Sequence, residues 1–313
     1  METQKALPTT LMEAVKYFSD LSVCRGFLAH LRWPDGVSCP RPGCGSENVG
    51  FIETRKIWRC KACKRQFSVK VGTIFEDSPL GLDKWLVAVW LLSSAKNGNS
   101  SYELSRALGV TQKTAWFMLH RIRLAMKTKS FRSRLSGEVE ADETYIGGRH
   151  EYMHNKRRKA LSTRDDRGKS VVMAMIERKG DVRAFIVPHA LDPVIRDRVR
   201  EHVQEGSRLY TDANRTYRPL DVEYFHDFVD HTTAYVKGRV HTNSIENFWS
   251  LLKRSLKGTY IKVEAPHLSR YVDEQAFRFN TRMIGDGERF SLAVAATDGL
   301  RLTYKDLTGK VEG

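Results

Sequence analysis

The sequence predicts an α+β protein of several domains, with a zinc ribbon and a helix-turn-helix in front of a mixed α/β core. Three observations predict it: two close cysteine pairs, a helical stretch broken by a glycine turn, and β-type runs alternating with helices in the second half. The 313 residues suffice for two or three domains. We expect a helical segment at 1–35, the ribbon at 36–78, the helix-turn-helix region at 79–130, the core at 136–285 and a C-terminal tail at 286–313.

The chain is strongly basic, with 52 Lys and Arg against 37 Asp and Glu and a formal net charge of +15. Such a surface favours polyanions, and nucleic acid is the commonest of them; solubility alone or an anionic membrane surface are the alternatives. The N-terminal residues lack the apolar run of a signal peptide, and the apolar stretch 85–92 is too short to span a bilayer. We therefore expect a cytoplasmic, nucleoid-associated protein.

Four of the five cysteines predict a structural zinc site. Cys39 and Cys44 form one pair, Cys60 and Cys63 form the other, and fifteen residues separate the pairs. Four thiolates suit tetrahedral zinc and close the site to substrate. The alternative is two chance pairs of free thiols. Cys24 stands in an apolar helical context, which indicates a core thiol.

The second cysteine pair is surrounded by cations and one aromatic residue, Trp58. This mixture suits a phosphate backbone, although a solvated ribbon face would look the same. The candidate DNA-binding residues here are Arg55, Lys56, Arg59, Lys64 and Arg65.

Residues 99–126 predict two helices that meet at Gly109, the second capped by Thr111. Gln112, Lys113 and Thr114 then lie at the exposed start of the second helix, where a recognition helix contacts base edges. Any helical hairpin with a glycine turn gives a similar pattern. The residues expected to pack the pair together are Ala107, Leu108, Val110, Ala115 and Leu119.

From residue 138 onward the pattern is mixed. Strands are predicted at 138–148, 170–178, 182–188 and 208–213, with a hairpin turn at 179–181 between the second and third. Asp192 and Pro193 open one helix, and residues 241–258 form another that stops at Gly258. This order predicts a sheet with helices packed on it.

Three carboxylates of this region are candidate metal ligands. Asp142 lies mid-strand among apolar residues, Asp212 ends a strand, and Glu246 lies early on an amphipathic helix with Lys253 on the same face. Oxygen ligands suit a pair of Mg²⁺ ions, and Lys253 would meet a phosphate. Taken singly, each aspartate is more often a hydrogen-bonded turn or strand-end residue, and Glu246 with Asn243 also fits a helix cap.

Several segments resemble the bacterial insertion-sequence transposases of the ISXO-two-like group, DDE enzymes with an N-terminal zinc ribbon. The matching segments are LRWPDGVSCP, CKACKRQFSVKVGTIFEDSPL, VEADETYIGG, LYTDANRTY, HTNSIENFWSLLKRSLKGTY and RYVDEQAFRFNTR. The resemblance implies a ribonuclease-H-like core whose catalytic residues map to Asp142, Asp212 and Glu246, with Lys253 as the basic residue that follows. Some relatives have Asn as third ligand, so Asn243 and Asn247 are supporting candidates. The Cys39–Cys44 spacing is wider than the family's usual pair.

The resemblance implies a transposase that cleaves DNA at its element's terminal inverted repeats and joins the freed ends to target DNA. It implies Mg²⁺ or Mn²⁺ at the catalytic carboxylates, structural Zn²⁺ in the ribbon, and at least a homodimer on DNA. The alternatives are a DNA-binding regulator derived from a transposase, without catalysis, and a nuclease that only hydrolyses.

Overall fold

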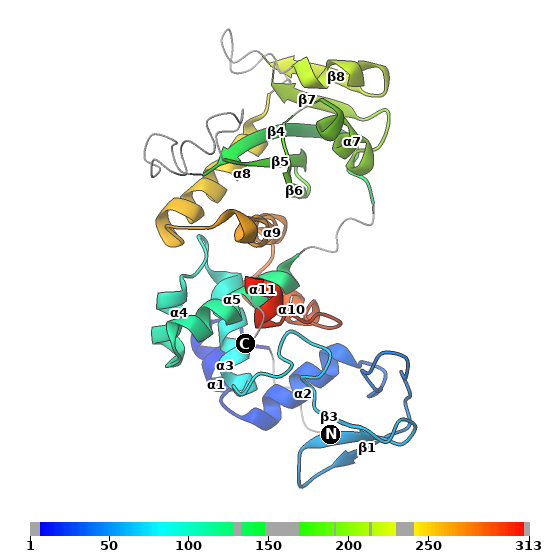
Figure 1. The fold of residues 1–313 in the computed structure, drawn as a ribbon, viewed down its shortest axis with the longest axis vertical. Coiled ribbons are helices and arrows are strands. Elements are labelled where there is room, and N and C mark those ends of the chain that lie inside the picture. Colours follow the sequence, from blue (N-terminus) through cyan, green and yellow to red (C-terminus); the bar gives the residue numbers. More distant parts are fainter. Residues whose placement is uncertain are drawn as a thin grey trace. The chain divides into compact units, whose positions relative to one another are not determined.

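The computed structural model describes residues 7–127, 133–147, 169–190, 192–212, 215–229 and 241–309. The chain forms two compact units (Figure 1). The N-terminal unit comprises Met1–Lys127 together with Thr281–Gly313, and the core unit comprises Thr128–Asn280. The regions expected to be the ribbon and the helix-turn-helix both fall within the N-terminal unit.

The N-terminal unit combines a three-stranded antiparallel sheet, in the order β1-β2-β3, with helices. Its strands are β1 (Val49–Ile52), β2 (Ile57–Cys60) and β3 (Gln66–Phe67). Its helices are α1 (Leu11–Tyr17), α2 (Leu21–Arg32), α3 (Leu82–Ser94), α4 (Ser101–Leu108), α5 (Gln112–Met126), α10 (Asp286–Ala295) and α11 (Tyr304–Thr308). No described helix has both the length and the apolar character that crossing a bilayer requires.

The helical part of this unit packs around α3, which contacts α1, α2, α4, α5 and α10. Phe290 of α10 completes an aromatic cluster: its ring stacks on Phe27 of α2 at 5.7 Å and lies 5.1 Å from Trp90 of α3. All three rings are buried. Residues 286–313, expected to form a tail, thus contribute α10 and α11 to the packing of the N-terminal unit.

Arg121 connects α5 to two other segments of this unit through hydrogen bonds. Its guanidinium donates to the carbonyls of Ile74 and Glu76 at 2.9 Å, and to that of Leu302 at 3.0 Å. A buried cation needs such acceptors to offset its lost hydration. The second helix of the predicted helix-turn-helix is therefore fixed to both the segment after the ribbon and the C-terminal segment.

The core unit contains a five-stranded mixed sheet in the order β6-β5-β4-β7-β8. Strands β4, β5 and β6 form an antiparallel meander, whereas β4, β7 and β8 are parallel. The strands are β4 (Glu138–Ile146), β5 (Ser170–Glu177), β6 (Val182–Val187), β7 (Arg208–Asp212) and β8 (Phe225–Val229). The helices are α7 (Asp192–His202), η2 (Arg215–Val222), α8 (Asn243–Arg254), η3 (Ser255–Thr259), η4 (Ala265–His267) and α9 (Leu268–Asn280).

Both faces of this sheet are covered (Figure 1). Helices α8 and α9 pack on the face that carries Val172 and Ala174, and α7 and η2 pack on the face that carries Val171 and Met173. Strand β5 is buried on both sides, which explains its unbroken apolar run. The face of the sheet that α8 and α9 cover is called the α8 face below, and the face that α7 and η2 cover is called the α7 face.

Two features of the core differ from the sequence-based expectation. Strand β8 was not predicted, although it forms an edge of the sheet. The predicted helix over 241–258 is also shorter, because α8 ends at Arg254 and a π-helical turn, η3, follows it. Lys257 therefore does not continue the α-helical stripe that carries Glu246 and Lys253.

Candidate active site and nucleic-acid interface

The pairing of β4 with β7 brings two of the candidate carboxylates to the same level of the sheet. The register aligns Glu138 with Arg208 and Glu140 with Tyr210. Two residues further along each strand are Asp142 and Asp212. Because side chains alternate between faces, Asp142 shares the α8 face with Glu138 and Glu140. Both positions lie two residues beyond the last paired residues of the two strands, at the same end of the pairing.

Helix α8 begins directly against β4 because Glu140 receives its first amide groups. The Glu140 carboxylate accepts from the backbone N–H of Ser244 at 2.9 Å and of Ile245 at 3.0 Å, and from the Ser244 hydroxyl at 3.1 Å. These N–H groups have no partner within the helix, and the helix dipole favours a negative charge at this end. Glu140 is thus a cap supplied by another element.

Arg178, at the end of β5, neutralises this buried carboxylate. Its Nε donates to Glu140 at 2.9 Å, and its Nη2 donates to the His241 carbonyl at 2.9 Å, just before α8. The guanidinium lies over the Tyr210 ring, 4.2 Å from its centre. Glu140 has no exposed surface, so pairing and several hydrogen bonds are what make its burial tolerable.

Asp142 is held by Trp249 of α8, whose indole Nε1 donates to the carboxylate at 2.8 Å. The pKa of Asp142 is raised to about 6, mainly by burial and to a smaller extent by the negative charges of Asp212 and Glu246, against the lowering effect of the indole. Asp212 and Glu246 therefore lie near enough to Asp142 to disfavour its charged form, although among the described residues only the four cysteines form a group whose ligand atoms are close enough to share one ion.

Glu246 projects from the first turns of α8 and is exposed. Thr242 is the N-cap residue and forms no side-chain cap bond; its hydroxyl instead donates to Glu246 at 3.3 Å. The alternative of an Asn243–Glu246 cap is thus wrong. Asn243 and Asn247 are exposed on α8, and Lys253, two turns beyond Glu246, is partly buried. The apolar residues of α8 and η3 that face the sheet are buried: Ile245, Phe248, Trp249, Leu252 and Leu256.

A fourth carboxylate, Glu143, lies beside Asp142 but on the α7 face. The Tyr217 hydroxyl donates to it. Burial raises the pKa of Glu143 to about 8, and the charges of Asp142 and Asp212 add to the rise. A protonated, hydrogen-bonded Glu143 adds no charge to the cluster at neutral pH.

The end of β7 is fixed by a chain of polar contacts. The buried hydroxyl of Thr211 donates to the Asp212 carbonyl at 2.8 Å and lies 2.9 Å from Nε2 of His226. Nδ1 of His226 lies 2.6 Å from Asp221. The Thr–His–Asp order resembles a nucleophilic triad, but the hydroxyl has no exposed surface. It serves to hold the strand at Asp212.

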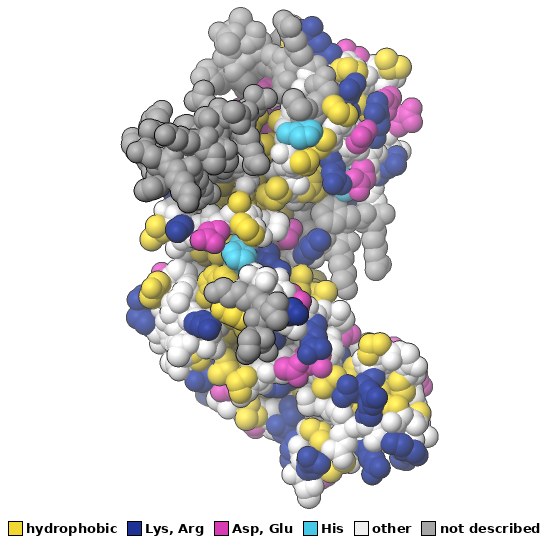
Figure 2. All heavy atoms as spheres, viewed as in Figure 1, with side chains coloured by type: hydrophobic (Ala, Val, Ile, Leu, Met, Phe, Trp, Pro, Cys, Tyr) yellow, Lys and Arg dark blue, Asp and Glu magenta, His cyan; other side chains and the backbone are white. Residues whose placement is uncertain are grey.

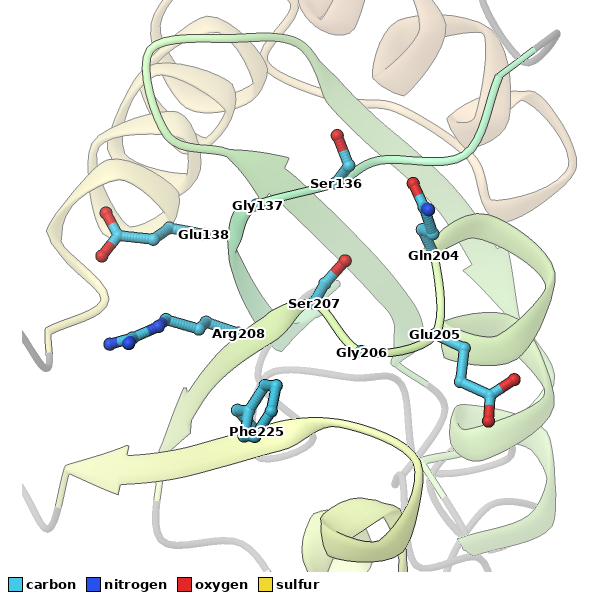
Figure 3. Close-up of a pocket in the computed structure, with 9 residues that line it drawn as sticks. All are labelled: Ser136, Gly137, Glu138, Gln204, Glu205, Gly206, Ser207, Arg208 and Phe225. Atoms are coloured by element: carbon cyan, nitrogen blue, oxygen red, sulfur yellow. The ribbon is translucent and has the colours of Figure 1, made fainter.

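A pocket of about 530 Å³ lies at the opposite end of these strands (Figure 3). Gly137 and Glu138 begin β4, and Ser207 and Arg208 begin β7, whereas Asp212 ends β7. The charged residues that line the pocket are Glu138, Glu205 and Arg208. Because they carry charges of both signs, the pocket is not suited to binding a polyanion. The pocket is separate from the carboxylate cluster.

The four predicted zinc ligands converge in the ribbon. The sulfur atoms of Cys39, Cys44, Cys60 and Cys63 all lie within 4.8 Å of one another, which fits a structural zinc ion. The backbone N–H of Cys63 donates to the Cys60 sulfur at 3.4 Å and is the main cause of the lowering of the Cys60 pKa to about 7. Cys24 is buried in α2 and donates to the Phe18 carbonyl at 3.1 Å, so it is the core thiol expected.

Lys and Arg side chains gather on the ribbon (Figure 2). The five predicted DNA-binding residues there, Arg55, Lys56, Arg59, Lys64 and Arg65, are all exposed. Trp58 instead packs within the ribbon, with its ring 6.0 Å from that of Phe67 and 5.6 Å from that of Trp33. These cations are therefore accessible to phosphates, with Lys56 paired to Glu53 at 2.8 Å and Arg55 donating to Gln66 at 2.9 Å, and the aromatic residue is structural.

The turn and the second-helix cap of the predicted helix-turn-helix are formed by the two residues expected from the sequence. Gly109 ends α4 in the left-handed conformation at φ 61°, and Thr111 caps α5. Lys113 is exposed and lies 4.9 Å above the Tyr304 ring of α11. Gln112 donates to Ser101 at 2.8 Å.

Two further details of this motif concern packing. The hydroxyl of Thr114 lies 2.8 Å from that of Thr111. Ala107, expected to pack between the helices, is exposed; Leu104 is the buried residue of α4, because it lies on the face turned toward α3 and α5.

Sequence reasoning missed Glu140, Arg178 and the indole donor of Trp249. A signal for Glu140 was present: residues 138, 140 and 142 are acidic and share one face of a predicted strand. Arg178 and the Trp249 contact carry no local signal, because they depend on how α8 crosses the sheet.

Comparisons with known proteins agree with this arrangement. A family profile described as an ISXO2-like transposase domain matches residues 134–280, and one described as a transposase zinc-ribbon domain matches residues 22–66. An "uncharacterized protein in transposable element ISH50" of Halobacterium salinarum is 33% identical over 262 residues, which cover 78% of this chain and 86% of that protein. An "uncharacterized transposase-like protein" of Haemophilus influenzae is 33% identical over 107 residues, or 34% of this chain and 86% of that protein.

The two profile matches identify a transposase of the DDE class, and the four-cysteine cluster and the mixed five-stranded sheet are consistent with them. The chain belongs to the ISXO2-like transposase family.

Proposed function

We propose that this protein catalyses divalent-metal-dependent cleavage and strand transfer of DNA, with Asp142, Asp212 and Glu246 as the metal ligands. The observation that carries the proposal is the arrangement of the carboxylates: Asp142 and Asp212 lie on the α8 face of the paired strands β4 and β7, and Glu246 lies in the first turn of α8. Hard divalent cations bind oxygen ligands and would offset the negative charge of these side chains. The donor set therefore fits Mg²⁺ or Mn²⁺.

The sheet supports a ribonuclease-H-like assignment for the core. Its order is β6-β5-β4-β7-β8, with an antiparallel meander on one side of β4 and parallel strands on the other. A ribonuclease-H-like core has the same order and places its carboxylates on the two central parallel strands. Asp142 on β4 and Asp212 on β7 occupy these positions.

The proposed reaction has two displacements at phosphorus. In the first, water attacks the phosphodiester at the end of the element, the P–O3′ bond breaks, and a 3′-hydroxyl and a 5′-phosphate result. In the second, that hydroxyl attacks a target phosphodiester and releases a target 3′-hydroxyl. Bound divalent metal supplies charge stabilisation to the attacking and leaving oxygens. The carboxylates hold and orient, and Lys253 contacts a phosphate.

The N-terminal unit supplies the DNA contacts in this proposal. The exposed cations of the ribbon would bind phosphates and give most of the affinity, with a strong dependence on salt. Lys113, Gln112 and Thr114 at the start of α5 would read the terminal inverted repeats. Since two ends must be joined to one target, we infer at least a homodimer on DNA.

The test is a strand-transfer assay with end-containing DNA, Mg²⁺ and the purified full chain. Replacing Asp142 or Asp212 with Ala should lower joining by about three orders of magnitude or more, because several kcal/mol of transition-state stabilisation are lost. End binding should persist. Asp197→Ala, an exposed carboxylate on α7, is the matched control and should join normally.

The assay also separates the alternatives. End binding without any cleavage by the wild-type chain would indicate a regulator, and cleavage without joining would indicate a nuclease. Equal joining by the Asp142 and Asp212 variants would remove the site assignment.

A further inference from the structure

Helix α8 is attached to β4 at two points with matching spacing. Its first amide groups, at Ser244 and Ile245, bind Glu140, and Trp249 binds Asp142. Four to five residues of helix span about 6–7.5 Å, and two residues of strand span about 6.6 Å. The two elements therefore run in the same direction, and the indole reaches Asp142 without distortion of either.

The indole itself is held firmly. Trp249 is 5% exposed and belongs to the hydrophobic cluster that α8 and α9 form with the sheet. Its ring lies 5.3 Å from that of Phe248. Close packing of this kind leaves one rotamer for a large ring. The N–H group therefore points at Asp142 whether or not another partner is present.

We propose that Trp249 is a positioning residue, which fixes the orientation of the Asp142 carboxylate so that its remaining lone pairs face the ions held with Asp212 and Glu246. A carboxylate offers about four acceptor positions, so one indole N–H leaves room for metal. Outer hydrogen-bond partners of metal ligands typically change metal affinity or activity by about 10–100-fold. The inference rests on the metal site of the proposed function.

The test measures metal affinity without DNA and without turnover. Mn²⁺ is titrated into the zinc-loaded full chain by calorimetry. Trp249→Phe keeps an aromatic ring but removes the donor, and should weaken Mn²⁺ binding about tenfold or more. Phe248→Leu disturbs the same cluster but keeps the indole N–H, and should leave the affinity within about twofold of wild type while lowering the free energy of unfolding.

A second measurement uses the wild-type chain alone. The indole N–H of Trp249 is followed by NMR hydrogen exchange and identified by its change in Asp142→Asn. Saturating Mg²⁺ should leave this N–H protected, because the indole and the metal use different lone pairs.

Three outcomes decide the matter. Equal Mn²⁺ affinity in Trp249→Phe and wild type, or loss of N–H protection in Mg²⁺, overturns the positioning role while the metal site stands. An equal loss in Phe248→Leu assigns the effect to packing and also overturns it. Wild-type chain that binds no Mn²⁺ overturns the proposed metal site itself, and the positioning role with it.

Discussion

The two clusters of potential metal ligands in this protein are built in opposite ways. In the ribbon, four sulfur atoms lie within 4.8 Å of one another around a very small core of Cys39, Cys60 and Phe67. In the core unit, Asp142 lies on a large five-stranded sheet that is covered by hydrophobic clusters on both faces. The ribbon cysteines are thus held by little apart from one another and the ion they fit, whereas Asp142 is held by the packing of the sheet and of α8.

The largest effect that tests this contrast is zinc removal. Cys60→Ser should release the zinc and unfold the ribbon, because structural zinc supplies on the order of 10 kcal/mol to such small folds. Zinc content is measured by atomic emission, and ribbon order by the NMR signals of Trp33 and Trp58. The core reporter Trp249 should keep its signal.

Cys24→Ala is the control for this experiment, since Cys24 lies in α2 and outside the cluster. Its zinc content should equal that of wild type. A ribbon that stays folded in zinc-free Cys60→Ser would contradict the contrast.

The next effect concerns Glu140, whose buried carboxylate is hydrogen-bonded to the start of α8 and paired with Arg178. Glu140→Gln removes the charge that Arg178 binds at 2.9 Å and that caps α8, and should lower the free energy of unfolding by about 3–5 kcal/mol in urea titrations. The double variant Glu140→Gln/Arg178→Met should recover part of the loss, because no unpaired charge remains.

Glu138→Gln is the matched control, as Glu138 lies 3.5 Å from Arg178 and is partly exposed. It should cost less than about 1 kcal/mol. If the single Glu140 variant were as stable as wild type, the capping of α8 by Glu140 would not contribute to the free energy of unfolding.

The smallest effect is the pH dependence of stability that Asp142 causes. Its pKa is raised from 3.8 to about 6 in the folded chain, so the folded state binds the proton more tightly than the unfolded state. The free energy of unfolding therefore falls as pH rises through this range and stays lower above it. Asn does not ionise, so Asp142→Asn should be more stable than wild type at pH 8, by on the order of 2–3 kcal/mol, and equal to it near pH 3.5.

Urea unfolding of the zinc-loaded chain in Mg²⁺-free buffer measures this difference, and added Mg²⁺ should reduce it. Asp197→Asn should show no pH-dependent gain. A wild-type chain more stable than Asp142→Asn at pH 8 without Mg²⁺ would show that the ionised carboxylate does not destabilise the folded chain.

Most features that could be predicted from the sequence depend on a few residues that are adjacent in the chain. Cysteine spacing located the ribbon ligands, and Gly109 and Thr111 located the turn and cap of the helix-turn-helix, because each of these features is set by a few adjacent residues. Strand β4 and helix α8 were likewise readable from their periodicity. The roles of Asp142, Asp212 and Glu246 as metal ligands stay a prediction.

Features that depend on distant parts of the chain were not readable. Strand β8 is short and lies at an edge, where the pattern is weak. The cap of α8 is 104 residues away in sequence, at Glu140. The periodicity of residues 286–295 is visible in Phe290, Ala293 and Val294, but nothing local says that this helix packs with α2 and α3.

The return of α10 to the N-terminal unit has a consequence for synthesis on the ribosome. Phe290 supplies a ring to the aromatic cluster of Phe27 and Trp90, and Leu302 receives the guanidinium of Arg121. Translation proceeds from the N-terminus, so these contacts form only after the whole core has emerged. A nascent chain that lacks these segments therefore has an incomplete packing scaffold around α3 and α5.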